Sequence, residues 1–153
     1  MAEKHHHIRC RQCRAKNRVP AGRLGDKPKC GKCGTLLDLK DFSGIPIEIT
    51  DAAYVDEIVE SALPVVLTCW APWCSACQAL LPTINRLAPQ YAGRIKFAKV
   101  NVEQNQQTGG RFSIQSIPAM LVLQNGQLIN RWVGALPEME LRRNLDAIDG
   151  AGA

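Results

Sequence analysis

The sequence predicts an α/β domain preceded by a smaller module organised by cysteines. From about residue 45 onward, short apolar runs alternate with segments of helical periodicity, which is typical of strands and helices packed together. Before that point the chain is poor in large apolar side chains but holds four of its seven cysteines. A chain of 153 residues has room for one ordinary domain and a small appendage. We expect a first domain at 1–40 and a second at 41–153, the latter including a short linker.

Bulk composition places the chain among globular proteins, because it is 46% hydrophobic and 22% charged. No apolar run approaches the ~20 residues that span a bilayer, and the first residues lack the apolar core of a secretory signal. We therefore expect a cytoplasmic protein with no membrane partner. Thiols stay reduced in the cytoplasm, so we expect the seven cysteines to be metal ligands and redox groups rather than structural disulfides.

Charge divides the chain at the same boundary. Residues 1–40 carry 11 basic and 3 acidic side chains, a formal +8, whereas residues 41–153 carry 8 and 11, a formal −3. A basic module could contact nucleic acid or an acidic protein. The simpler interpretation is that the basic side chains solvate a very small domain and offset anionic thiolates at a metal site. We do not expect nucleic acid as a partner.

The four N-terminal cysteines have the spacing of a zinc site. Cys10 and Cys13 form one C-x-x-C unit, and Cys30 and Cys33 form a second after sixteen intervening residues. Each unit can present two sulfurs from one tight turn. Two such turns complete a tetrahedron of thiolates with no open position, so we expect one structural Zn²⁺ per chain.

The small size of this module supports a metal. About forty residues with few large apolar side chains cannot fold on a hydrophobic core alone, and zinc binding at roughly 10–16 kcal/mol is a sufficient replacement. We expect a zinc ribbon whose short β-hairpins carry the two turns, with Gly31 and Gly34 accepting positive φ. Two labile disulfides without metal are the alternative. His5, His6 and His7 have no ligand role once four cysteines complete the site.

Apolar patterns predict the elements of the second module. A short strand at 47–49 leads to a helix that Thr50 or Asp51 could cap and that carries Tyr54, Val55, Ile58, Val59 and Leu63 on one face. A continuous apolar run at 65–70 is typical of a buried central strand. The remaining elements are a helix from Cys74 toward Tyr91 kinked at Pro82, a strand at 95–101, a short helix at 105–112, a hairpin turning at Asn125–Gly126 and a final helix after Pro137.

A third C-x-x-C unit, Cys74 to Cys77, follows the buried strand and begins a helix. Helical spacing puts both thiols on one face, close enough for a disulfide. Cys74 lies at the positive end of the helix dipole, which favours the thiolate that attacks disulfides. Cys77 lies one turn further in, and we expect it to be more buried and to react second. Half a metal site or two packed cysteines are the alternatives, but no unpaired C-x-x-C unit remains to complete a metal site.

The segment "VVLTCWAPWCSACQALLP" resembles the active-site segment of the thioredoxin family, in which a buried strand leads into W-C-G-P-C. The resemblance continues through "KFAKVNVEQN", "FSIQSIPAMLVLQNGQ" and "VGAL", and it covers residues 45 to about 149. With the four-cysteine ribbon in front, the whole chain resembles the bacterial thioredoxin 2 type. This resemblance implies a thioredoxin fold, a mixed central sheet flanked by helices, behind a zinc-ribbon domain.

The resemblance also implies roles for single residues. Cys74 matches the family's nucleophile and Cys77 its resolving cysteine. Lys99 matches a lysine beneath the site, and Pro118 matches a cis-proline opposite the dithiol. A groove that holds an extended segment of the substrate would be formed by Trp73, Ile117, Pro118, Gly134 and Ala135.

Two departures from the family pattern bear on the chemistry. Ser75–Ala76 stands between the cysteines where the family usually has Gly-Pro, which should shift the redox potential in a direction the sequence does not fix. Thr68 stands where the family has a buried aspartate under the resolving cysteine. Because threonine cannot exchange a proton near neutral pH, the usual base for Cys77 is missing and Lys99 would lack its partner. Cys69 is expected to be a core residue.

These features together predict a protein-disulfide reductase that works by dithiol–disulfide exchange. The family implies that its partners are disulfide-containing proteins and an NADPH-supplied thioredoxin reductase, and we expect a monomer. One alternative is a disulfide isomerase or oxidase, which a shifted potential would favour. The other is a binding module, in which the basic ribbon docks on a partner and the second domain is a scaffold.

Overall fold

The computed structural model describes residues 5–151, with side chains as far as residue 148. Two sheets are present in this part of the chain. The smaller sheet pairs β1 (His5–Arg9) with β2 (Lys16–Pro20) as an antiparallel hairpin. The larger sheet has five strands in the order β3-β5-β4-β6-β7.

The larger sheet is mixed, as expected. Its central strand β4 (Val65–Trp70) runs parallel to β5 (Lys96–Asn101) and antiparallel to β6 (Ala119–Gln124). At one edge β3 (Ile47–Ile49) runs parallel to β5, and at the other β7 (Gln127–Val133) runs antiparallel to β6. The turn between β6 and β7 is Asn125–Gly126, with φ of 54° and 80°, which confirms the predicted hairpin.

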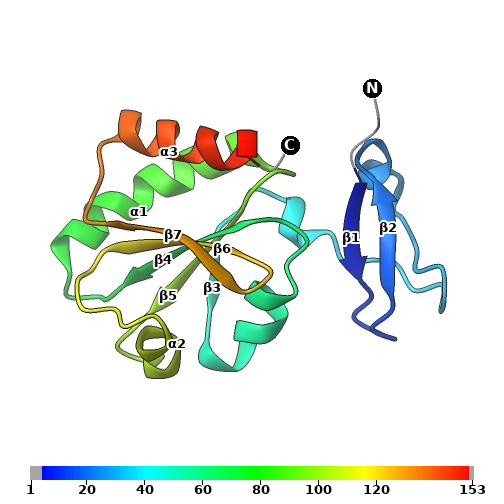
Figure 1. Ribbon diagram of the computed structural model, residues 1–153, viewed down its shortest axis with the longest axis horizontal. Helices are drawn as coiled ribbons and strands as arrows, with labels where there is room; N and C mark the ends of the chain where they lie inside the picture. The colour runs from blue at the N-terminus through cyan, green and yellow to red at the C-terminus, as the bar shows by residue number, and fades with distance from the viewer. Residues whose placement is uncertain (1–4, 152–153) are drawn as a thin grey trace.

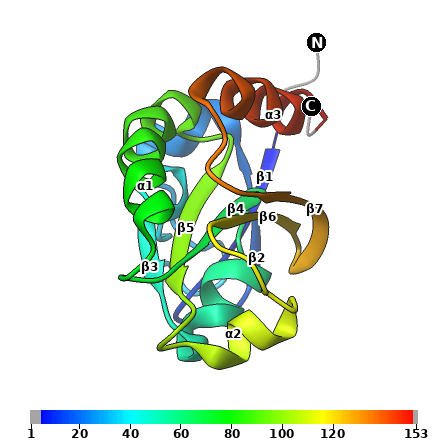
Figure 2. The same ribbon diagram turned by 90° about the vertical axis from the view of Figure 1, so that its left-hand side faces the viewer.

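Helices cover both faces of this sheet (Figures 1 and 2). One face carries α1 (Ser75–Leu87) and α3 (Glu138–Ala151), which cover a core that includes Val66, Leu80, Leu87, Met120 and Leu141. The other face packs against the helical turns that follow β3, and α2 (Gln106–Arg111) lies on the same side. A 3₁₀ segment, Ala88–Tyr91, continues α1 toward the predicted end of that helix, and Pro82 lies inside α1.

The predicted helix after β3 is wrong in its form. The chain makes a 3₁₀ turn at Asp51–Ala53 and then a π-helical turn at Val55–Val59, and Leu63 lies beyond both. Asp51 does not cap its own turn. Its carboxylate instead accepts the N–H groups of Gln107, at 3.2 Å, and Thr108, at 2.8 Å, at the start of α2. The π-helical turn also buries a polar residue, Glu57, which an apolar pattern cannot reveal.

The junction between the small sheet and the large one is built on a buried lysine. Lys96, at the start of β5, is only 4% exposed. Its Nζ donates to the carboxylate of Glu57 at 2.8 Å and to the Glu57 carbonyl at 2.7 Å, and it forms an ion pair with Asp41 at 2.7 Å. Asp41 belongs to the 3₁₀ turn Lys40–Phe42 that links the two parts of the chain, so the predicted boundary at residues 40 and 41 falls inside this turn. That boundary stays a prediction.

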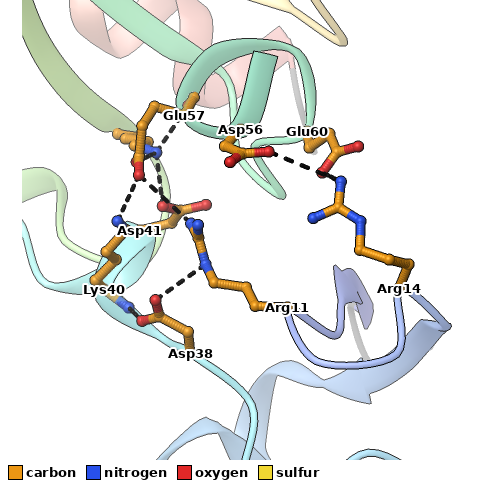
Figure 3. Close-up of polar contacts among 9 residues, drawn as sticks. Arg11, Arg14, Asp38, Lys40, Asp41, Asp56, Glu57 and Glu60 are labelled. Atoms are coloured by element: carbon orange, nitrogen blue, oxygen red, sulfur yellow. Dashed lines mark hydrogen bonds and ion pairs between the residues drawn. The ribbon is translucent and has the colours of Figure 1, made fainter. Parts of the chain in front are cut away.

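Arginines of the small N-terminal module extend the junction (Figure 3). Arg11 pairs with Asp38 at 3.1 Å and with Glu57 at 3.6 Å. Arg14 pairs with Glu60 and, at 3.8 Å, with Asp56. Part of the positive charge of residues 1–40 therefore faces acidic side chains of the second domain. We had expected the basic side chains of this module to solvate it and to offset anionic thiolates. That interpretation did not include ion pairs with the second domain.

We predict that Lys96→Met lowers the free energy of unfolding by about 3 kcal/mol, because it leaves two carboxylates in a site built for an ammonium group. Urea unfolding at pH 7 measures the change. Lys27→Met is the matched control, because Lys27 is exposed and has no carboxylate partner in the described residues, and it should change stability by less than about 0.5 kcal/mol.

The effect should depend on pH. Burial alone would raise the pKa of Glu57, but hydrogen bonds from Lys40 and Lys96 outweigh it and hold that pKa below its ordinary value. Such a group stabilises the fold above the pKa it has when unfolded, and this contribution is lost as the pH falls through the folded pKa. The difference between wild type and Lys96→Met should therefore shrink at acidic pH. A difference that stays constant down to about pH 3 would contradict the ion-pair account.

Candidate redox site and candidate metal site

The dithiol lies where the central strand turns into α1. Strand β4 ends at Trp70, and Cys74 is the N-cap residue of α1, with an extended backbone. The Cys74 sulfur accepts the N–H of Cys77 at 3.1 Å. The two Cα atoms are 5.2 Å apart and the sulfurs are joined as a disulfide. This confirms the predicted placement of the third C-x-x-C unit at a helix start, on one face.

The two cysteines differ in access. Cys74 is 7% exposed and Cys77 is completely buried. Trp73 precedes them with 70% of its surface exposed, so it is not held in a core. A protein surface that keeps a large aromatic ring in water beside a reactive sulfur is suited to contact another molecule.

A second loop faces the dithiol. The Cys74 sulfur lies 3.8 Å from the carbonyl oxygen of Ile117, and the Ile117–Pro118 peptide bond is cis, as the resemblance implied. Gly134 donates its N–H to the Pro118 carbonyl at 2.8 Å and has a φ of 95°, which favours glycine. Ala135 follows and is exposed. The structure thus brings four of the five predicted groove residues into the loops around Cys74, with Ala135 next in the chain, and their role toward a substrate stays a prediction.

Thr68 lies within the same face of the sheet as the α1 core. Side chains two positions apart in a strand point to the same face, so Thr68 lies on the face of Val66. Side chains three positions apart in a helix lie on one side, so Cys77 lies on the side of Leu80. Val66 and Leu80 belong to the same core cluster, so Thr68 and Cys77 face the same layer of the protein. Thr68 is 1% exposed, and its hydroxyl has no hydrogen-bond partner in the described residues. A buried hydroxyl without a partner is costly. No titratable side chain stands at this position of the strand.

Lys99 has neighbours that the sequence analysis missed. It lies opposite Thr68 in the β4–β5 register and opposite Glu48 in the β3–β5 register. Its Nζ is 5.8 Å from the centre of the Trp70 ring. Burial raises the pKa of Glu48, and the positive charge of Lys99 opposes that rise. Lys99 therefore has Thr68 and no aspartate at that position, as expected, but it lies next to a carboxylate on the neighbouring strand, Glu48, on which its charge acts. Glu48 could be found as a neighbour of Lys99 only from the order of the strands in the sheet, and the apolar pattern of the sequence does not give that order.

Cys69 is a core residue, as predicted. It is completely buried, and burial raises the pKa of its thiol to about 12. Its thiolate is therefore not available for exchange near neutral pH.

The N-terminal cysteines lie in two turns of the same construction. In the first, the N–H of Arg14 donates to the Cys10 carbonyl at 2.8 Å, and in the second the N–H of Gly34 donates to the Cys30 carbonyl at 2.9 Å. Both donors have positive φ, 67° and 79°. The prediction for Gly34 is confirmed, whereas Gly31 does not use positive φ, and in the first turn the strained position is filled by Arg14.

The two turns bring four free thiols together. Cys10 and Cys33 have sulfurs 3.6 Å apart, Cys13 and Cys30 have sulfurs 3.5 Å apart, and all four lie within 4.8 Å of one another. Thiolates around a tetrahedral Zn²⁺, each bound at ≈ 2.3 Å, are about 3.8 Å apart. Backbone N–H groups of Cys33 and Lys32 lower the pKa of Cys30 to about 6, which favours the thiolate that binds metal. The cluster fits a four-coordinate metal ion, and His5 to His7 are not part of it.

His5 to His7 form strand β1 instead. His6 is 6% exposed and its ring packs edge-on against Phe42 at 4.9 Å. This residue therefore belongs to the packing of the ribbon.

Comparisons with known proteins agree with this geometry. Residues 45–147 match the family model for thioredoxin, and residues 9–35 match the model for the N-terminal segment of thioredoxin 2. A thioredoxin of Haemophilus influenzae is 42% identical over 95 residues, which cover 62% of this chain and 89% of the relative. Thioredoxin 2 of Chlorobaculum tepidum is 39% identical over 69% of this chain and 96% of its own length. Thioredoxin C-3 of Corynebacterium nephridii is 36% identical over 91% of this chain and 92% of its own length.

The described residues contain no helix that is long and apolar enough to cross a membrane. The first of these matches covers the dithiol domain, and the second covers the four-cysteine turns that precede it in the chain. The disulfide at the start of α1 lies within the first match, and the four-thiol cluster, which could hold a metal ion, lies within the second. The chain belongs to the thioredoxin family and is a protein-disulfide reductase with an N-terminal ribbon of the thioredoxin 2 type.

Proposed function

We propose that Cys74 is the nucleophile and Cys77 the resolving cysteine of a two-step reduction. The Cys74 thiolate attacks one sulfur of a substrate disulfide, which forms a mixed disulfide and releases the other substrate sulfur as a thiolate. Cys77 then loses its proton and attacks the Cys74 sulfur. The Cys74–Cys77 disulfide forms, the second substrate thiolate leaves, and two electrons have passed to the substrate. Thioredoxin reductase, as the general partner of the family, returns the two electrons.

The difference in burial between the two sulfurs carries this assignment. Cys74 is at the N-cap, where the N–H of Cys77 stabilises its thiolate, and it borders solvent beside Trp73. Cys77 is fully buried and can reach the Cys74 sulfur only. The groove proposed for the substrate uses the exposed ring of Trp73, the backbone beside Ile117 and Pro118, and the surface at Gly134 and Ala135. An extended substrate segment would lie there as an added strand.

Two cysteine variants test the order of attack. We predict that Cys77→Ser accumulates a stable mixed disulfide with a protein substrate such as insulin, because the first step proceeds and the second cannot. Cys74→Ser should form none. Non-reducing gels with mass spectrometry of the trapped peptide provide the measurement, and Cys69→Ala, which alters only a core thiol, should turn over normally. Trapping through Cys77 in the Cys74→Ser variant would reverse the proposed roles.

We further propose that Cys10, Cys13, Cys30 and Cys33 hold one structural Zn²⁺ per chain. Bound there, zinc would supply the folding free energy that the small ribbon core lacks. Four protein ligands leave it no open position, so it takes no part in the exchange reaction. Free thiolates at the metal site are compatible with the reducing cytoplasm, where we place the protein, and we propose that it acts as a monomer.

Metal analysis tests the zinc proposal. The purified chain should contain one zinc per chain, and Cys30→Ser should contain none because three thiolates bind much more weakly. The variant should lose the signals of residues 5–40 in an NMR spectrum while the signals of β4 and α1 remain. Full zinc occupancy in Cys30→Ser would show that Cys30 is not a ligand, and Lys32→Gln, a change within the same turn, should keep the metal.

Thr68 should limit the second step, because Cys77 must lose its proton without a buried acid beside it. We predict that Thr68→Asp speeds disulfide reduction near neutral pH by about tenfold, since a general base is worth ~10²–10⁴-fold and a path through solvent recovers part of that. The same change should lower the free energy of unfolding by about 1–3 kcal/mol, because a buried carboxylate is costly and Lys99 already faces Glu48.

Stopped-flow reduction of a model disulfide and urea unfolding measure the two effects of Thr68→Asp. Thr68→Asn is the matched control, because it has the same shape as the aspartate but cannot accept a proton near pH 7. It should be no faster than wild type. If the Asn and Asp variants have equal rates, the missing base does not limit this enzyme.

A further inference from the structure

The ribbon carries basic side chains that the junction does not use. Arg18, Arg23 and Lys29 are exposed and line one hollow of about 350 Å³, whose walls come from residues 17–31 of the ribbon alone. The one carboxylate in the wall is Asp26, which lies 3.9 Å from Arg23. In the described residues no carboxylate pairs with Arg18 or Lys29. The hollow therefore keeps a formal charge of about +2, and we refer to it as the ribbon pocket.

The fold of the ribbon holds the walls of the ribbon pocket in place. Asn17 accepts the N–H of Gly31 with its side-chain oxygen at 2.9 Å and donates its amide to the Ala15 carbonyl at 3.1 Å. The bond from Gly31 ties strand β2, which carries Arg18, to the second cysteine turn, which lies next to Lys29. Val19 is buried behind the pocket. A preformed charged hollow binds a partner with less ordering cost than mobile surface lysines would.

The ribbon pocket and the dithiol lie at opposite ends of the molecule. Strands β4 and β5 are parallel, and the junction lies at Lys96, where β5 begins, whereas Cys74 lies beyond the end of β4. Figure 1 shows β1 between β2 and the large sheet, so the strand that carries Arg18 is on the far side of the ribbon. The ion pairs of Arg11 with Glu57 and of Arg14 with Glu60 join the ribbon to the second domain in this position.

We propose that the ribbon pocket binds an acidic segment of the disulfide-containing substrate while Cys74 attacks the disulfide. This inference rests on the proposed function and adds a substrate class, disulfide proteins that carry a run of Asp or Glu side chains. A guanidinium group donates two parallel N–H hydrogen bonds to a carboxylate, which suits Arg18 and Arg23. A substrate held at the pocket has a raised effective concentration at the dithiol, because its second contact is intramolecular.

An acidic polypeptide fits these observations better than a nucleic acid. Residues 5–41 contain no Phe, Trp or Tyr, so the ribbon offers no aromatic ring of these types on which bases could stack. Residues 41–153 carry a formal −3 and would repel a phosphate backbone that ran past the ribbon. A polypeptide, in contrast, can place its acidic run on the ribbon and its neutral disulfide segment on the dithiol.

Two recombinant substrates test the proposal. Both carry the same disulfide peptide and a Gly/Ser linker of about 40 residues, which spans roughly 35 Å on average, and they end in eight Glu or eight Gln residues. At 50 mM salt we expect the reduced, zinc-loaded protein to have a KM about tenfold lower for the Glu substrate than for the Gln substrate, with equal kcat. Each of the three charge pairs adds only modestly to the binding free energy, and together they account for about this factor. The difference should vanish at 0.5 M salt.

Charge-matched variants separate the ribbon pocket from the general field of the ribbon. The triple change Arg18→Gln, Arg23→Gln and Lys29→Gln should raise the KM for the Glu substrate about tenfold and leave the Gln substrate unchanged. The control removes three other ribbon charges, by changing Lys16, Lys27 and Lys32 to Gln, and should alter that KM less than threefold. Bound zinc and circular dichroism are measured for both, so that a misfolded ribbon is recognised.

Each outcome decides the matter. Equal KM values for both substrates, or equal losses in the two triple variants, would overturn the ribbon pocket as a binding site while leaving the reductase intact. Turnover of neither substrate would instead contradict the proposed function. A single-stranded oligonucleotide that inhibits the Glu substrate at a lower concentration than a free Glu₈ peptide does would assign the pocket to nucleic acid, and the proposal would fail.

Discussion

The pairing of β4 on both sides by β5 and β6 is the constraint on which both functional ends of this molecule depend. Strand β4 is buried from Val65 to Cys69, so its position in the sheet is fixed by apolar packing on two faces. Because β5 runs parallel to it, the ends of the two strands align. One end delivers the chain into α1 and places Cys74 opposite the cis-proline loop. The other end places Lys96 where the ribbon docks.

The buried side chain of Lys96 lies at the centre of a group of charges where the linker and the ribbon meet the second domain. An isolated buried ammonium group is very costly. The ammonium group of Lys96 is therefore paired with two carboxylates, one from Glu57 and one from Asp41 in the linker. Arg11 and Lys40 then approach Glu57 from the ribbon side. Charged groups therefore meet where the two domains join, next to apolar packing of Phe42 and Ala62 on the ribbon core.

Much of this arrangement could be predicted from the sequence because it depends on local chemistry. The strand at Val65–Trp70, the hairpin at Asn125–Gly126 and the three C-x-x-C units follow from apolar runs, turn residues and spacing. The π-helical turn at Val55–Val59 could not be predicted, since Glu57 points inward to reach a lysine thirty-nine residues later in the chain. Glu48 was missed for a similar reason: its contact with Lys99 depends on strand order.

The three C-x-x-C units show how one spacing serves two chemistries. In each unit a backbone N–H points at the first sulfur: Cys13 to Cys10, Lys32 to Cys30 and Cys77 to Cys74, at 3.5, 3.4 and 3.1 Å. The difference lies in the next residues. Positive φ at Arg14 and Gly34 reverses the chain, so that each N-terminal unit meets the other and four sulfurs converge, which suits a metal ion. After Cys74 the chain continues as helix α1, and within the described residues the sulfur bonded to Cys74 is that of Cys77 in the same unit. A pair of sulfurs that can bond to each other is suited to exchanging electrons, whereas two pairs that face each other are suited to holding an ion.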